Sequence, residues 1–90
     1  MLVSTKDMLA HAQAGGYAVP SPDFIDSRSA RAFCSVADEL RAPLILSFAE
    51  VHREHLSVAE AAELGRFYAE RACAPVALHL DHGVTFSVIE

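Results

Sequence analysis

The sequence predicts an α/β fold in which parallel strands alternate with amphipathic helices, and two observations carry this prediction. Helical and strand-like segments alternate along the chain in the order α–β–α–β–α–β. Residues 43–49 and 75–81 are largely apolar runs, which is typical of parallel strands covered on both faces. Single helices between such strands imply right-handed βαβ units. Three strands leave two open edges, so a doubly wound sheet or a (β/α)8 barrel of about 250 residues is expected to complete them.

The first helix is predicted to begin at Ser4 or Thr5 and to end near Ala14. A hydroxyl at the N-cap accepts a hydrogen bond from the first turn, and the glycines at 15–16 tolerate the left-handed conformation that ends a helix. Residues 17–20 are then predicted to form a short first strand.

Asp26 or Ser27 is predicted to cap a second helix that runs to about Arg41, before the buried strand at 43–49. Apolar residues on this helix recur at the i, i+3, i+4, i+7 spacing of an amphipathic helix. They are Ala30, Phe33, Cys34, Ala37 and Leu40.

Ser57 and Glu60 have the spacing of a capping box and predict the start of a third helix. Gly65 is expected to weaken this helix. The third strand follows at 75–81, and residues 84–90 are predicted to begin another helix. The core stripe of the third helix is predicted to be Ala61, Leu64, Tyr68 and Ala72.

Composition excludes several classes of partner. The formal net charge is −5 and the Lys and Arg residues are scattered, so no basic stripe for nucleic acid exists. No apolar run reaches the roughly 20 residues of a membrane span, and the chain turns polar after three residues, unlike a signal peptide. Cys34 and Cys73 match no zinc or redox spacing, which favours reduced thiols in a cytoplasmic protein. A small phosphorylated substrate remains compatible, because one or two local donors suffice.

The segment "PVALHLDHG" is the strongest candidate for chemistry. Along a strand side chains alternate, so Ala77, His79 and Asp81 share one face, and His82 follows where the strand ends. The carboxyl ends of parallel strands are where α/β proteins bind ligands. His82 can bind zinc while Asp81 moves a proton, or Asp81 can simply orient His82 or His79. A catalytic zinc takes about three protein ligands, so others must come from elsewhere.

A second histidine pair, His52 and His55, lies in the loop after the second strand. Its H-x-x-H spacing lacks the H-E-x-x-H order of a helical metalloprotease motif. Loops at this end are exposed, and we expect a solvated loop.

Three segments, taken in order, resemble the class II, zinc-dependent ketose-bisphosphate aldolases. "LVSTKDMLAHAQAGGYAVP" resembles their opening helix and first strand, and "SARAFCSVADELRAPLILSFAE" their next helix and second strand. "PVALHLDHG" is similar to their third-strand motif and is the most specific of the three.

The resemblance implies the N-terminal part of a TIM (β/α)8 barrel, with about three parallel strands, in a homo-oligomeric enzyme. Such an enzyme reversibly cleaves a ketose bisphosphate to dihydroxyacetone phosphate and an aldehyde. By this resemblance His82 is a ligand of the catalytic Zn²⁺ and Asp81 is the acid/base at the C4 hydroxyl. His79, one layer deeper, is expected to be a supporting or structural residue.

Two departures from the family pattern bear on the substrate. Asp23 stands where many members have a substrate-facing asparagine, and Ala49 precedes Glu50 where many have serine. A divergent substrate such as tagatose 1,6-bisphosphate is therefore a candidate beside fructose 1,6-bisphosphate. The remaining zinc ligands and phosphate loops of the family lie beyond the third strand, so residues 1–90 are expected to be a truncated domain, inactive alone.

Two other interpretations remain open. H-x-D-H also occurs in metallo-β-lactamases, but Ala77 stands where their motif has its first histidine, and βα alternation argues against their fold. Alternatively, the chain is a non-catalytic fragment that assembles with itself or with a complementary chain through strands 17–20 and 75–81.

Overall fold

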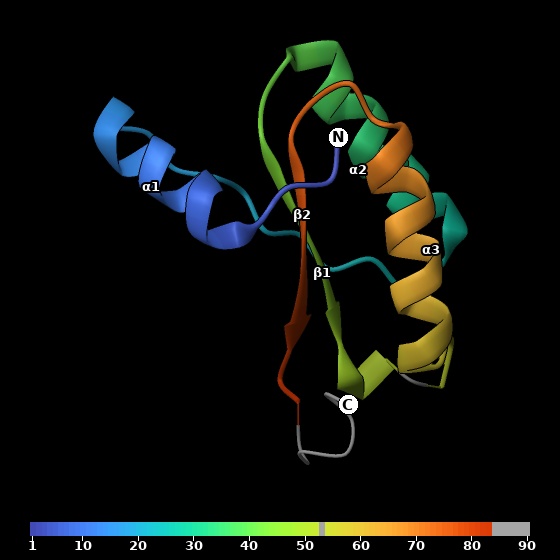
Figure 1. Cartoon of the computed structure of the whole chain (residues 1–90). Helices are drawn as coiled ribbons and strands as arrows, with labels where there is room; N and C mark the ends of the chain where they lie inside the picture. The colour runs from blue at the N-terminus through green and yellow to red at the C-terminus, as the bar shows by residue number, and fades with distance from the viewer. Residues whose placement is uncertain (53, 84–90) are drawn as a thin grey trace.

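The computed structural model describes residues 1–52 and 54–83. In these ranges a small parallel sheet has two helices on one face and one helix on the other (Figure 1). Helices α2 and α3 lie on one face of the strands, and α1 lies on the other. The elements are α1 (Thr5–Gly15), α2 (Ser27–Leu40), β1 (Leu44–Ala49), the 3₁₀ turn η1 (Glu50–His52), α3 (Val58–Arg71) and β2 (Val76–Asp81). The helix predicted at 84–90 lies outside the described residues.

β1 and β2 are parallel neighbours, in a register that runs from Leu44↔Val76 to Ala49↔Asp81. On the other edge of β2, the N–H of Val76 donates to the carbonyl of Met1 and its carbonyl accepts from Val3, at 2.8 and 2.9 Å. The chain start therefore extends the sheet briefly beyond β2, at its amino end.

Residues 19–24 lie beside β1 as well, although they form only an isolated bridge. The carbonyls of Pro20 and Pro22 accept hydrogen bonds from β1 at 3.0 Å each, and the N–H of Phe24 donates to β1 at 2.8 Å. The strand predicted at 17–20 is thus wrong in its bounds. Proline has no N–H to donate, so this segment pairs mainly through its carbonyls and starts later than its apolar residues indicated.

The larger core lies between the sheet and the two helices α2 and α3, and the smaller one lies against α1. In the smaller core Met8 packs on Ile45 and Ala77. Ala77 thus faces away from the larger core that holds Val76, as the alternation of β2 predicted. Leu40 was predicted to be buried but is 68% exposed, because α2 ends there and Arg41 turns left-handed at φ 52°. The buried residues of the larger core are Phe24, Ala30, Cys34, Ala37, Leu44, Leu46, Phe48, Ala61, Ala69, Ala72, Ala74 and Val76.

Side-chain caps define where the helices begin. Ser57 and Glu60 form the predicted capping box of α3. At α2 the cap is Asp26, whose carboxylate accepts from the N–H of Ser29 at 2.8 Å. These hydrogen bonds lower the pKa of Asp26. The cap is therefore fully formed at neutral pH and is lost only as the pH falls through that lowered pKa.

The carboxylate of Asp38 links α2 to the turn between α3 and β2 through hydrogen bonds. Oδ1 of Asp38 accepts from the main-chain N–H groups of Cys73 and Ala74, at 2.9 and 2.8 Å. Burial, with the Asp38 carboxylate nearby, raises the pKa of the Cys34 thiol, so this buried cysteine stays protonated. Both cysteines are free, as predicted. Cys73 was also expected to lie within a helix and to be partly buried, but it follows the end of α3 and is exposed.

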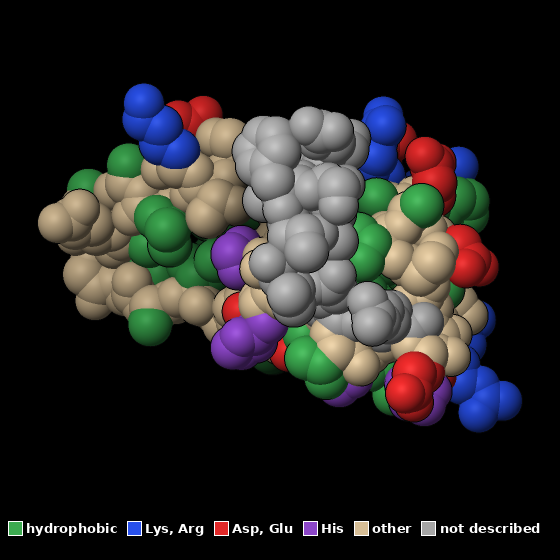
Figure 2. All heavy atoms as spheres, turned by 90° about the horizontal axis from the view of Figure 1, so that it is seen from below, with side chains coloured by type: hydrophobic (Ala, Val, Ile, Leu, Met, Phe, Trp, Pro, Cys, Tyr) green, Lys and Arg blue, Asp and Glu red, His purple; other side chains and the backbone are tan. Residues whose placement is uncertain are grey.

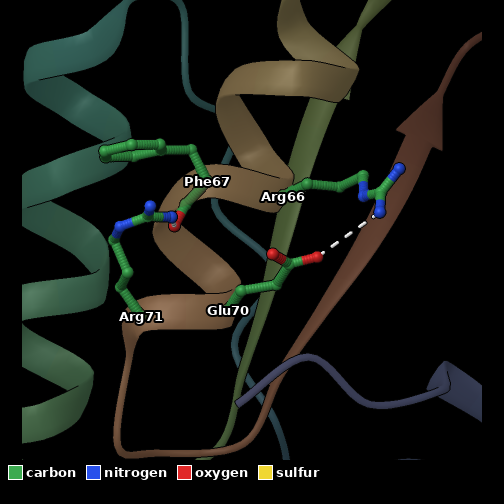
Figure 3. Close-up of polar contacts among 4 residues, drawn as sticks. All are labelled: Arg66, Phe67, Glu70 and Arg71. Carbon is green, nitrogen blue, oxygen red and sulfur yellow. Dashed lines mark hydrogen bonds and ion pairs between the residues drawn. The ribbon is translucent and has the colours of Figure 1, made fainter.

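The outer surface of α3 carries local polar contacts (Figure 3). Arg66 and Glu70 form an ion pair at 3.5 Å, and the guanidinium of Arg71 lies 3.7 Å from the centre of the Phe67 ring. Exposed pairs one helical turn apart contribute little to stability. None of the helices in the described ranges has the length and apolar character that a bilayer crossing requires.

Gly65 lets α3 approach β2 closely. A β-carbon built on Gly65 would lie 2.9 Å from a methyl group of Leu78, and both pack near Phe24. We expect Gly65→Val to lower the free energy of unfolding by about 1–3 kcal/mol, because the branched side chain overpacks this contact. In Gly65→Ala the gain in helix propensity, about 1 kcal/mol, offsets the shift of one terminal methyl.

Denaturant titration of the two Gly65 variants beside the parent measures this difference. Equal loss in Gly65→Ala and Gly65→Val would contradict the packing explanation. A gain in stability in both variants would instead support the sequence-based view that the glycine is merely a weak point in the helix.

Candidate active site at the carboxyl end of the sheet

The candidate residues lie at the end of the sheet to which the parallel strands point. Asp81 is the last residue of β2 and pairs in register with Ala49, the last residue of β1. Viewed from this end, histidine and carboxylate side chains gather next to one another (Figure 2). This is the end at which parallel α/β folds bind their ligands.

Asp81 and His82 are brought together by an unusual backbone conformation. Successive side chains of a strand point to opposite faces, but His82 has a left-handed φ of 53°. Its Nε2 lies 3.7 Å from Oδ1 of Asp81, and the two side chains are 74% and 38% exposed. Non-glycine residues rarely adopt this conformation, and such residues concentrate at functional sites.

A polar layer lies below this pair on the same face of the sheet. His79 is the register partner of Ser47, whose neighbours Leu46 and Phe48 face the helices instead. Ser47 is only 1% exposed, and its Oγ lies 2.5 Å from Oγ of Ser21. Sequence reasoning missed both serines. The available signal was a serine interrupting an otherwise apolar strand, opposite a histidine.

Asp23 lies at the same end but is not part of the Asp81–His82 pair. It forms a parallel bridge with Ser47 through the main chain, and its side chain is exposed. Within residues 1–52 and 54–83 no hydrogen bond or ion pair joins Asp23 to Asp81 or His82. The side chain of Asp23 is thus free to contact a substrate in front of the strands, but no direct contact in the described residues links it to the Asp81–His82 pair.

The donor set fits a zinc site in part. Imidazole is a usual zinc ligand, and the side chain of His82 is exposed at the strand end, beside the Asp81 carboxylate. Among the described residues no three His, Cys, Asp or Glu side chains gather closely enough to hold a metal ion. If His82 holds a metal ion, the other ligands therefore lie outside these ranges.

The H-x-x-H pair takes no part in such a cluster within the described ranges. His52 is half-buried, with its ring edge-on to Phe48 at 6.5 Å between centres. His55 is exposed, and its N–H donates to the carbonyl of His52 at 2.9 Å.

Comparison with known proteins decides the family. The profile of the family described as fructose-bisphosphate aldolase class-II matches residues 3–90. The chain belongs to the class II fructose-bisphosphate aldolase family. This confirms the resemblance first seen in the three sequence segments.

A solved structure of one aldolase confirms the fold class. The crystal structure of the YdjI aldolase from Escherichia coli K12 superposes with a TM-score of 0.92 at 24% sequence identity. The match covers 99% of this chain and 34% of that one, so the chain spans about a third of that aldolase. The matched part is the N-terminal portion of its TIM barrel, as predicted.

Proposed function

We propose that this chain contributes the first strands of a zinc-dependent class II aldolase that reversibly cleaves a ketose bisphosphate. The observation that carries the proposal is the Asp81–His82 pair, held at the carboxyl end of β2 in a chain of this family. The products are dihydroxyacetone phosphate and an aldehyde. The carboxylate-and-imidazole pair supplies a proton acceptor and a metal ligand side by side.

Asp81 is the acid/base of this reaction. In cleavage its carboxylate takes the proton of the C4 hydroxyl, the C4 carbonyl forms, and the electrons of the C3–C4 bond pass toward the ketone. In the reverse direction it returns the proton to the new hydroxyl. Its half-exposed position at the strand end gives a substrate access to the carboxylate.

His82 holds the metal in this proposal, together with ligands from outside the described residues. When bound, zinc would polarise the substrate ketone and stabilise the negative charge that develops as the bond breaks. The left-handed backbone of His82 keeps its ring near Asp81, so the ligand and the acid/base face one substrate.

Asp23 and Ala49 bear on the choice of substrate. Ala49 is the register partner of Asp81, whereas Asp23 bridges to Ser47 on the other side of β1. A carboxylate in place of an amide repels a substrate phosphate and can only accept hydrogen bonds, which the hydroxyls of a sugar donate. We therefore propose that a sugar hydroxyl, rather than a phosphate, lies against Asp23, in fructose or tagatose 1,6-bisphosphate.

The remainder of the barrel is a further part of the proposal. On the edge of β2 that faces away from β1, the main chain of Val76 hydrogen-bonds to residues 1–3. Among the described residues no main-chain hydrogen bond is made on that edge by Leu78 or Leu80. An open parallel edge of this kind is a surface for another strand. Further residues, a second copy or a complementary chain supply those strands, and residues 1–90 alone are then inactive.

The test is aldol cleavage by the complete product of the gene that contains these residues, with the 90-residue chain as control. Release of dihydroxyacetone phosphate is followed with an NADH-linked dehydrogenase, on fructose and tagatose 1,6-bisphosphate in turn. We expect turnover that a chelator abolishes, zinc restores and borohydride leaves intact, because no lysine Schiff base forms.

Three outcomes would each contradict part of the proposal. Cleavage that survives complete chelation excludes the metal role. Inactivation by borohydride in the presence of substrate indicates the lysine chemistry instead. Cleavage by the 90-residue chain, at a rate equal to that of the complete product, shows that no further strands are needed.

A further inference from the structure

The face of the sheet that α1 covers changes from apolar to polar toward the carboxyl end. Ile45 and Ala77 form an apolar level that packs on α1. The next level is polar, with Ser47 and His79 in register, and Asp81 stands one level above His79 on the same strand face. Polar side chains that lie below a catalytic carboxylate can orient it, whereas those beside it would contact the substrate.

Ser47 has hydrogen-bonding capacity that its known partner does not use up. Its side chain is almost fully buried, and its hydroxyl pairs with that of Ser21 at 2.5 Å. A hydroxyl donates one hydrogen bond and accepts two, so this contact occupies a single position. The side chain beside it across the ladder is the imidazole of His79.

The carboxylate of Asp81, in turn, needs a hydrogen-bond donor to fix its orientation. Its neighbour His82 is 3.7 Å away, which is longer than a hydrogen bond, and in the proposed function His82 is committed to the metal. His79 precedes Asp81 by two residues on the same face, about 6.6 Å along the strand, which is within reach of an imidazole. A general base works best when another group fixes its orientation.

We propose that His79 is a positioning residue that holds the carboxylate of Asp81 for proton transfer, and that the Ser21–Ser47 pair fixes His79 in turn. A neutral imidazole has one donor and one acceptor. In the structure His79 is exposed, and of these contacts only Ser21–Ser47 is within hydrogen-bond distance. A rotation of the His79 side chain would let one ring nitrogen accept from the hydroxyl of Ser47 and the other ring N–H donate to Asp81. This inference rests on the proposed function and names the group that orients its acid/base.

The test compares His79→Phe with His79→Gln in the complete gene product. Phenylalanine keeps the ring volume but neither donates nor accepts, whereas glutamine does both. We expect His79→Phe to lower kcat about 10–100-fold, as loss of an orienting group does, with KM, bound zinc and Tm unchanged. His79→Gln recovers most of kcat, and Ser47→Ala loses kcat in the same direction by a smaller factor.

A double-mutant cycle separates positioning from packing. If Ser47 acts on Asp81 through His79, Ser47→Ala has little further effect on kcat once His79→Phe is present. Equal kcat loss in the Phe and Gln variants, a rise in KM, or unchanged kcat in His79→Phe would each overturn the inference. An active parent with unaffected variants refutes only this inference, whereas a parent inactive on every ketose bisphosphate refutes the proposed function and leaves His79 nothing to position.

Discussion

Replacing Asp81 with asparagine is expected to lower kcat for aldol cleavage about 10²–10⁴-fold, the range that general acid/base groups contribute. Asparagine has nearly the same shape as aspartate and still accepts hydrogen bonds, but it takes no proton at neutral pH. Asp81 is half-exposed at the end of β2, and among the described residues its carboxylate makes no hydrogen bond that the amide would break, so the fold should be retained. Steady-state kinetics in both reaction directions, with zinc content measured on the same samples, gives the comparison.

Asp23→Asn is the matched control, because it makes the same chemical change at the same end of the sheet. Asp23 is exposed and stands beside β1, away from the Asp81–His82 pair. We expect this variant to change KM, or the preference between ketose bisphosphates, and to leave kcat within about tenfold of the parent. If Asp81→Asn behaves like Asp23→Asn, with kcat largely kept, the proton is carried by another group.

The helices and β1 were predictable because local signals and burial agree there. The capping box at Ser57 and Glu60 and the apolar run of β1 each specify one structure at short range. Residues 19–24 were harder to place, because their pairing depends on which carbonyls meet β1 in space. The exposure of Leu40 likewise follows from where α2 ends, which a periodic pattern does not define.

The candidate site was predictable in its location more than in its geometry. Alternation along β2 placed His79 and Asp81 on one face correctly, since side-chain direction in a strand has a period of two. The left-handed turn at His82 and the Ser21–Ser47 contact were not predictable. The first is a backbone state that histidine seldom adopts, and the second joins residues 26 positions apart, one in β1 and one in the segment beside it.

The left-handed turn at His82 makes its replacement a test of two separate properties. His82→Asn is expected to weaken zinc binding well beyond the 10–100-fold that loss of a mere supporting contact costs, because a direct ligand is removed. Asparagine is among the few residues that tolerate a positive φ, so the turn itself should survive. Competition with a chromophoric chelator measures the affinity, and activity should recover only at high zinc concentrations.

His55→Asn supplies the control for an exposed imidazole at the same end of the molecule, and it should bind zinc as tightly as the parent. His82→Val separates the backbone from the ligand, because a β-branched residue at φ 53° is strained by roughly 1–2 kcal/mol. That variant should therefore unfold at lower denaturant than His82→Asn even without metal, while both bind zinc equally poorly. Tight zinc binding by His82→Asn would remove His82 from the ligand set and leave its strained turn to serve Asp81 alone.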